Sequence, residues 1–200
     1  MSSRVLLEPT RRRLTPRQAA TVDRLAAAVL DELDGGGYDA LTVRRVARRA
    51  GVAPATAYTY FTSKAHLVAE VFWRRLRALP ETHADARRAA AERAGAVLGD
   101  VARFVAAHPA LSAACSPALL ADDPDVAELR DRIGAELHRR IRDALAAGGD
   151  EDHAEVDDLA TALDLLLAGA LLRAGMGHVG YDDLAPQLDR LARLVLGDRP

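Results

Sequence analysis

Apolar residues recur along this chain with the period of amphipathic α-helices, and no run of residues alternates in the manner of a β-strand. The first apolar stripe has offsets of three and four residues and consists of Val22, Leu25, Ala26, Val29, Leu30 and Leu33. Thr15 and Pro16 suit the start of this helix, since threonine caps a helix and proline lacks only an N–H that would be unpaired there. The glycine triplet at 35–37 predicts its end.

Two short helices are predicted next, joined by a turn that contains glycine. Thr42 suits the cap of the first, and Gly51 permits the positive φ of a tight turn. Pro54 fits the first turn of the second, at 54–60. Two short helices joined in this way are typical of a helix-turn-helix unit.

Longer helices are predicted for the rest of the chain. Ser63 suits the cap of a helix at 64–79, which Pro80 ends. Further proline and glycine breaks delimit helices at roughly 82–107, 109–121, 124–146, 153–175 and 182–196. The pattern therefore predicts an all-α protein, with an N-terminal three-helix helix-turn-helix domain followed by a larger helical domain.

The helix predicted at 153–175 differs from the others, because residues 160–172 are apolar around nearly the whole circumference. Such a helix is buried on more than one side, which predicts core on one face and a partner subunit on the other. The last helix can pair with it, and two such helices from each of two chains would form a four-helix bundle. The predicted interface consists of Leu163, Leu166, Leu167, Ala170, Leu188, Leu191 and Val195. The alternative is that both are core helices of a monomer.

Composition places the chain among ordinary globular proteins. It has 200 residues, half of them apolar and 28% charged, which favours a folded core in one domain or two small ones. No apolar run is long enough to span a bilayer, and no apolar segment follows the N-terminal arginines as in a signal peptide. Cys115 is the only cysteine, and no cysteine–histidine spacing suggests zinc. We therefore expect a soluble cytoplasmic protein with no membrane partner, no bound metal and no cofactor.

The charge is distributed unevenly. Residues 1–79 carry 14 basic and 7 acidic side chains, whereas residues 80–200 carry 13 basic and 22 acidic ones. A basic N-terminal third joined to an acidic remainder favours a unit that binds a polyanion, attached to a body that does not. The alternative is charge scattered over an ordinary surface.

Lys64 is the only lysine of the chain and follows the predicted cap Ser63. The N-terminus of a helix carries partial positive charge, so a cation there is unfavourable by itself. The position is explained if an external anion occupies the helix end, and a DNA phosphate is the obvious candidate.

The segment GVAPATAYTYFTSKAHL, preceded by DALTVRRVARRA, resembles the DNA-binding domain of TetR-type (tetracycline-repressor-like) transcriptional regulators. The resemblance covers about residues 15–70, and the remainder is similar only in length and helical character. It implies a homodimer, usually a repressor, that a small molecule releases from operator DNA. The expected organisation is a basic N-terminal arm (1–14), a helix-turn-helix DNA-binding domain (15–66) and a ligand-binding and dimerisation domain (67–200).

The candidate DNA contacts follow from this arrangement. The first turns of a recognition helix meet base edges, which here would bring Pro54, Ala55, Thr56 and Thr59 to the bases. Phenolic hydroxyls reach phosphates, so Tyr58 and Tyr60 are candidates, although one of them could instead pack under the helix. Thr42 and Arg44, together with Ser63 and Lys64, are expected on the phosphate-facing surface, with a plain structural cap as the alternative for Thr42.

Two features of this region depend on the resemblance. Family members often place a basic arm in the minor groove, a role for which Arg11, Arg12 and Arg13 are candidates. A disordered basic tail is the alternative. At Ala53 the sequence departs from the family pattern, in which serine or threonine is frequent, so one capping and phosphate contact is expected to be missing.

A pocket is expected among the central helices. Its candidate lining residues are Trp73, Leu76, Phe104, Leu111, Cys115, Leu119 and Leu120, with Arg103 and His108 as polar groups. An apolar or aromatic effector suits such a lining, whereas the alternative is that these residues are core and the two polar ones are solvated.

No set of residues suggests catalysis. The aspartate pairs at 122–123, 157–158 and 182–183 lie near predicted helix starts, where carboxylates favour the helix dipole. We therefore expect that the protein is not an enzyme. An architectural DNA-binding protein without an effector is a further alternative.

Overall fold

The structure is a computed structural model, and it describes residues 15–149 and 152–197. Within these ranges all regular structure is helical, which confirms the predicted all-α class. The elements are α1 (Pro16–Ala40), α2 (Val43–Arg49), α3 (Pro54–Tyr60), α4 (Lys64–Arg77), α5 (Ala90–Ala107), α6 (Pro109–Leu119), α7 (Pro124–Ala146), α8 (His153–Gly175), the 3₁₀ turn η1 (Tyr181–Asp183) and α9 (Leu184–Leu196).

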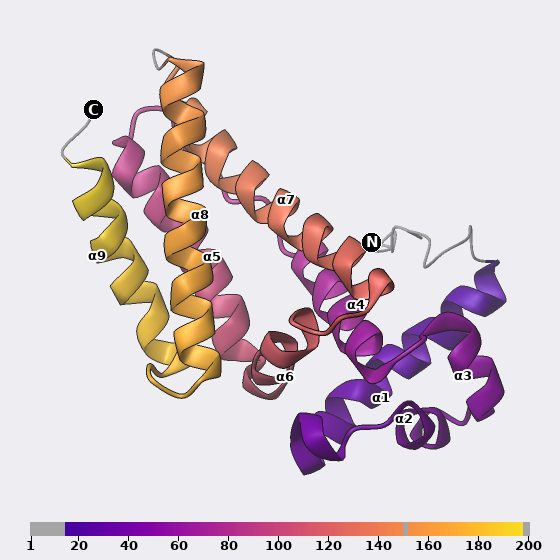
Figure 1. The fold of residues 1–200 in the computed structure, drawn as a ribbon. Coiled ribbons are helices and arrows are strands. Elements are labelled where there is room, and N and C mark those ends of the chain that lie inside the picture. Colours follow the sequence, from indigo (N-terminus) through magenta and orange to yellow (C-terminus); the bar gives the residue numbers. More distant parts are fainter. Residues whose placement is uncertain (1–14, 150–151, 198–200) are drawn as a thin grey trace.

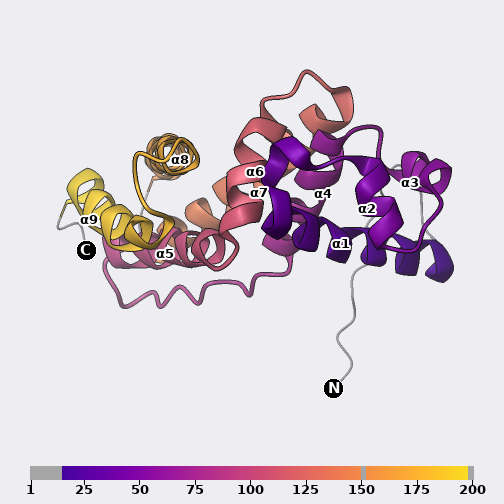
Figure 2. The same ribbon diagram turned by 90° about the horizontal axis from the view of Figure 1, so that it is seen from below.

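The helices form two groups that α4 connects (Figure 1). Helices α1, α2 and α3 gather at one end, and α5, α8 and α9 lie at the other. Helix α4 leaves the first group and packs against α6 and α7, while α7 in turn packs against α8 (Figure 2). No helix in the described ranges has the length and apolar character that crossing a membrane requires.

The predicted end of the first helix is confirmed and one other boundary was wrong. The backbone leaves helical geometry at Gly37, the last glycine of the triplet, with φ 66° and ψ −173°, and the last residues of α1, to Ala40, follow a kink there. The helix expected from residue 82 begins only at Ala90. Before it, the Asp85 carboxylate accepts a hydrogen bond from the Arg87 N–H at 3.0 Å, a local turn that competes with helix.

The turn between α2 and α3 follows from local backbone chemistry. Gly51 adopts φ 62° and donates its N–H to the Arg48 carbonyl, while Val52 donates to the Ala47 carbonyl. These two bonds form a Schellman motif, which satisfies carbonyls at the end of α2. At the start of α3 the cap residue Ala53 makes no side-chain bond, as expected for alanine. Phe61, at the end of α3, is completely buried in the core.

A buried carboxylate joins α1 to α2. Glu32 is only 7% exposed and accepts hydrogen bonds from Arg45 Nε at 2.8 Å and Arg49 Nε at 2.6 Å. The hydrogen bond from Arg49 lowers the pKa of Glu32, against the opposing effect of burial, and Arg45 lowers it further. Glu32 therefore holds the helix-turn-helix unit together and neutralises part of its positive charge.

The Glu32 contact predicts a pH-dependent stability. A carboxyl group with a lowered pKa contributes stability above its unfolded pKa and loses that contribution as the pH falls through its folded pKa. At pH 7 we expect Glu32→Gln to lower the free energy of unfolding by about 1–2 kcal/mol, because ionic hydrogen bonds are replaced by weaker ones. Denaturant titrations at several pH values below 7 should show the two proteins converging as the pH falls below the ordinary glutamate pKa of 4.5.

The matched control is Asp34→Asn, which changes an exposed carboxylate of the same helix. We expect its effect to stay within about 0.5 kcal/mol. A difference between Glu32→Gln and the parent protein that does not change with pH would contradict the role given to the ionised carboxylate.

Candidate DNA interface and ligand cavity

Helix α3 presents its candidate DNA-contacting residues to solvent. Pro54, Ala55, Thr56 and Thr59 are exposed, and Tyr58 keeps 46% of its surface exposed. The helix is held by Ala57, which is buried, and by the flanking residues Val52 and Phe61, which are buried in the core. Thr59 Oγ1 donates to the Ala55 carbonyl at 3.1 Å, so its hydroxyl hydrogen is used within the helix. Tyr60 is half-buried.

Helix α2 contributes cations that the rest of the protein does not neutralise. Thr42 Oγ1 accepts from the Arg45 N–H at 3.2 Å and so caps the helix. Arg44 and Arg48 are exposed and form no ion pair with any carboxylate in the described ranges, in contrast to Arg45 and Arg49 on Glu32. Arg48, which the sequence pattern did not single out, thus has the same electrostatic character as Arg44.

Lys64 has a partner inside the protein. Its Nζ donates to the Tyr38 carbonyl at 2.9 Å and lies 4.2 Å from the centroid of the Tyr38 ring. An external anion is therefore not needed to explain this lysine, since a carbonyl near the end of α1 and a cation–π contact already stabilise it. Contact of Lys64 with DNA stays a prediction.

The residues just before α4, Thr62 and Ser63, bind Asp123 and Asp125 at the start of α7, and we call these bonds the α4–α7 contact. Ser63 Oγ accepts from the His66 N–H, which caps α4, and donates to Asp123 Oδ2 at 2.7 Å. Thr62 Oγ1 donates to Asp125 Oδ2 at 2.8 Å. Asp123 also caps its own helix through Oδ1, which accepts the Asp125 N–H at 2.9 Å. Sequence reasoning gave Asp123 only a favourable interaction with the dipole of its own helix, because its partner Ser63 lies 60 residues away.

The predicted interface residues on α8 and α9 divide into two sets. Leu163, Leu167 and Leu188 are buried within the chain's own core, so their assignment to a subunit interface was wrong. Leu166, Ala170 and Leu191 are partly buried, and Val195 is exposed.

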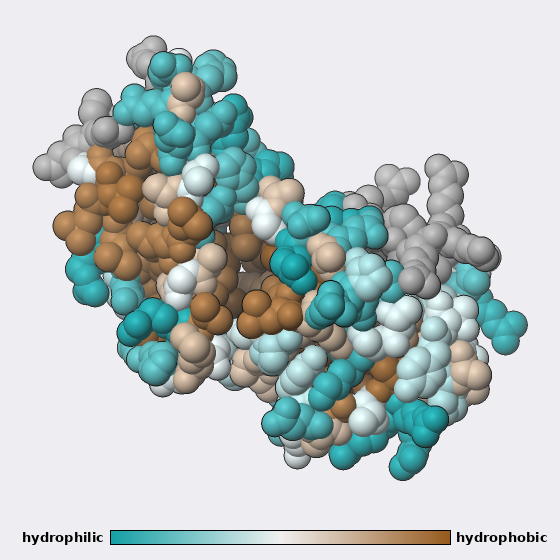
Figure 3. Space-filling model, viewed as in Figure 1, coloured by the Kyte–Doolittle hydropathy of each residue, from teal (hydrophilic) through white to brown (hydrophobic). Residues whose placement is uncertain are grey.

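The outward face of these two helices carries other leucines. Leu165 is 71% exposed and Leu194 is 74% exposed, and neither was singled out from the sequence. Figure 3 shows a continuous hydrophobic surface over α8 and α9. When a helix is apolar around its whole circumference, its sequence does not show which side faces the core. This explains the error.

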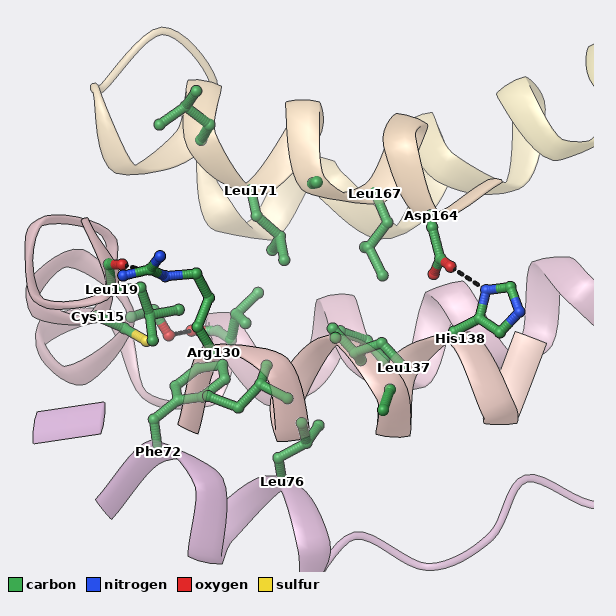
Figure 4. A pocket seen from close by; sticks show the side chains of 18 of the residues that line it. Phe72, Leu76, Cys115, Leu119, Arg130, Leu137, His138, Asp164, Leu167 and Leu171 are labelled. Carbon is green, nitrogen blue, oxygen red and sulfur yellow. Dashed lines mark hydrogen bonds and ion pairs between the residues drawn. The ribbon is translucent and has the colours of Figure 1, made fainter. Parts of the chain in front are cut away.

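A cavity of about 780 Å³ lies between α4, α6, α7 and α8. In Figure 4, Leu167 and Leu171 of α8 form one wall, Phe72 and Leu76 of α4 lie opposite, and Cys115 and Leu119 of α6 lie at one end. The size is typical of a small-molecule site, and most of the lining is apolar.

Sequence reasoning identified this lining in part. Leu76, Cys115, Leu119 and Leu120 line the cavity, whereas Trp73, Arg103, Phe104, His108 and Leu111 do not. The three apolar residues of the second set are packed in the core, and Arg103 pairs with Asp100. His108 accepts a hydrogen bond from Arg75 Nη1 through Nε2, which leaves Nδ1 to donate to the Phe104 carbonyl.

The contribution of α7 and α8 was missed. Arg130, Leu137 and His138 of α7 line the cavity together with Asp164 of α8. His138 Nδ1 hydrogen-bonds Asp164 Oδ2, and burial raises the pKa of Asp164 while the histidine opposes that shift. Arg130 donates to the carbonyls of Leu119 and Ala121 at 2.8 and 3.2 Å. The cavity thus has polar groups at two ends, which Figure 4 shows separated by leucines.

The sequence matches the family described as "Bacterial regulatory proteins, tetR family" over residues 25–71. An uncharacterised HTH-type transcriptional regulator of Mycobacterium tuberculosis is 41% identical over 208 residues, which cover 98% of this chain and 94% of that protein. The HTH-type transcriptional repressor KstR of the same organism is 30% identical over 88% of this chain and 80% of its own length.

Solved structures share the fold. A TetR transcriptional regulator from Rhodococcus sp. RHA1 has a TM-score of 0.71 at 24% identity, covering 91% of this chain and 98% of that one. FadR from Bacillus subtilis, in complex with stearoyl-CoA, has a TM-score of 0.65 at 16% identity, covering 89% and 99%. The helix-turn-helix geometry and the relatives that span nearly the whole chain agree: this protein belongs to the tetR family of bacterial regulatory proteins and is a DNA-binding transcriptional regulator.

Proposed function

We propose that this protein is a homodimeric repressor that leaves its operator when a small apolar molecule binds the cavity between α4, α6, α7 and α8. One observation carries the proposal: α7 lines the cavity through Leu137 and His138 and, at its first turn, holds the N-terminal end of α4 through Asp123 and Asp125. A molecule that displaces α7 therefore acts directly on the helix that joins the DNA-binding group to the body.

We propose that residues 15–66 bind DNA and that residues 67–200 bind the ligand and the partner subunit. Its support on the DNA side is the exposed surface of α3 and, on the adjoining α2, Arg44, which pairs with no carboxylate among the described residues. Threonine hydroxyl and methyl groups suit base edges, and phosphates attract the arginine and the Tyr58 hydroxyl. Tyr60, Ser63 and Lys64 remain candidates with less exposed side chains. Arg11, Arg12 and Arg13 lie outside the described residues.

The ligand side is supported by the chemistry of the cavity. Most of its exposed surface is apolar and leucine is its commonest lining residue, which favours an apolar body. The similar FadR from Bacillus subtilis was solved with stearoyl-CoA, a molecule with a long apolar chain, and the relative KstR is named as a repressor. Both are consistent with a repressor that senses an apolar molecule.

The coupling that we propose is thermodynamic. The ligand must bind the DNA-incompetent arrangement of α4 and α7 better than the DNA-bound arrangement, since equal affinity for both would shift nothing. By linkage, DNA must weaken ligand binding by the same factor, typically about 5- to 150-fold.

The proposed dimer uses the outward face of α8 and α9. Leu165 and Leu194 expose most of their surface there, and Val195 adds to the same region. A contiguous apolar surface of this kind is typical of a protein–protein interface. A two-fold axis through it would place the same residues on both sides and set two DNA-binding units for two half-sites.

The proposed phosphate contact of Arg44 predicts a change in salt dependence. We expect Arg44→Ala to weaken binding equally to a selected operator and to a random-sequence duplex, because phosphate contacts carry no sequence information. Losing one phosphate contact should reduce the slope of log affinity against log salt by about 0.9 in fluorescence anisotropy titrations. Arg103→Ala, which removes a cation paired with Asp100 on α5, is the control and should leave the slope unchanged. An unchanged slope for Arg44→Ala would remove Arg44 from the interface.

The proposed subunit interface predicts an effect of charge at Leu165. We expect Leu165→Glu to convert dimers to monomers in sedimentation velocity experiments, because two carboxylates would be buried near the symmetry axis. Leu120→Glu is the matched control, since Leu120 is 76% exposed but lies beyond the end of α6. Dimers that survive Leu165→Glu, or dissociate equally in both variants, would contradict the proposed interface.

The proposed ligand site predicts that filling the cavity abolishes induction. Gly134 of α7 lines the cavity, and a Cβ there would meet no atom within 4 Å, so Gly134→Leu adds volume without a clash at the backbone. Replacing a glycine inside a helix should also keep or raise the melting temperature. Dodecanol and 2-acetylnaphthalene should stabilise the parent protein and weaken its binding to an operator selected from random DNA, and neither effect should appear in Gly134→Leu.

Calorimetry then tests whether binding of the compound is coupled to DNA binding. The affinity of each compound is measured with and without the selected operator, and the two values should differ by the factor by which the compound weakens DNA binding. Equal affinities would overturn the induction mechanism, and induction that persists in Gly134→Leu would overturn the site.

A further inference from the structure

The hydroxyl of Tyr181 is buried and has no hydrogen-bond partner, and it is the only buried side-chain nitrogen or oxygen of the described residues in this state. Almost all buried polar atoms in native proteins are paired, because an unpaired one loses its hydration without compensation. A buried orphan hydroxyl therefore needs an explanation, and Tyr181 belongs to the lining of the cavity.

The position of this hydroxyl is fixed where α6 passes close to the end of α8. Tyr181 begins η1, directly after the loop that follows α8. A Cβ placed on Gly175 would collide with Ser116 Oγ and would lie 3.9 Å from the Tyr181 hydroxyl, so the three residues meet at one point.

The hydroxyl and the neighbouring thiol are uncharged hydrogen-bond donors. Burial raises the pKa of Tyr181, with a further contribution from the neighbouring Cys115, so the phenol keeps its proton. Burial also raises the pKa of the Cys115 thiol, which is therefore neutral. The three arginines of the lining are already engaged: Arg130 donates to the carbonyls of Leu119 and Ala121, Arg139 to Glu136, and Arg142 to Asp157.

We propose that the effector carries an uncharged acceptor oxygen, such as a ketone or ether oxygen, on its apolar body, and that the Tyr181 hydroxyl donates a hydrogen bond to this oxygen. The inference rests on the proposed function of the cavity and narrows it to a class of ligand. A site with an unpaired donor rejects an analogue that lacks the matching acceptor, because the donor then stays unpaired. Tyr181 is accordingly a specificity-determining residue, which separates oxygenated apolar molecules from hydrocarbons of the same shape.

Two probes of nearly the same shape test this. 2-Acetylnaphthalene and 2-ethylnaphthalene differ in a carbonyl oxygen, and calorimetry should show that the parent protein binds the ketone more tightly. Tyr181→Phe removes only the hydroxyl and should weaken ketone binding by about 5- to 10-fold, the value of one neutral hydrogen bond, while hydrocarbon binding stays the same. Tyr38→Phe is the control, since Tyr38 lies outside the cavity lining and loses the same group.

A second measurement examines the protein without ligand. Because the Tyr181 hydroxyl has no partner, Tyr181→Phe should leave the ligand-free melting temperature unchanged or raise it. A lower melting temperature would overturn the inference, since the hydroxyl would then already be paired.

The remaining outcomes distinguish this inference from the proposed function. If the parent protein binds both probes equally, or Tyr181→Phe weakens both alike, the role of Tyr181 is overturned while the cavity stands as a binding site. If the parent protein binds neither naphthalene probe nor dodecanol, the proposed function fails, and the inference fails with it.

Discussion

One carboxylate, Asp123, serves the N-terminal ends of two helices. The starts of α4 and α7 both carry partial positive charge, so bringing them together is unfavourable without an anion between them. Asp123 accepts the Asp125 N–H of α7 with one oxygen and the hydroxyl of Ser63, the cap of α4, with the other. Thr62 and Asp125 add a second bond across the same junction. This polar contact and the packing of α1 against α6 together hold the DNA-binding group against the body.

Apolar packing is extensive elsewhere along α4. The polar bonds of the α4–α7 contact can therefore break or shift more easily than the rest of the helix. The side chains of 65–73 in α4 are buried, and its end is fixed where Arg140 donates to the carbonyls of Leu79 and Pro80 at 3.1 and 3.0 Å. A well-packed helix moves as a rigid body, so under the proposed mechanism we expect a shift of α7 to reach the α4–α7 contact rather than to be absorbed. The cavity lies against α7 between these two anchors.

The features that sequence reasoning predicted well are those that local chemistry decides. Thr15, Thr42 and Ser63 cap the helices assigned to them, and Gly51 adopts the positive φ expected of the turn. The misses are interactions between distant segments, such as Lys64 with the Tyr38 carbonyl and His138 with Asp164, which lie 26 residues apart in each case. The sequence also did not determine which side of α8 faces the core. Apolar residues occur on all sides of this helix, so only the packing of neighbouring helices fixes which side is buried.

The charges counted along the sequence show which cations can reach DNA only once their partners in the structure are known. The 14 basic side chains of residues 1–79 overstate the number of cations free to contact DNA, since Arg45 and Arg49 are paired with Glu32. Ser63 shows a related constraint. A hydroxyl has one hydrogen to donate, and Ser63 donates it to Asp123, so it cannot donate to a phosphate at the same time. A phosphate contact at Ser63 therefore requires the α4–α7 contact to open, and DNA and Asp123 compete for the same hydrogen.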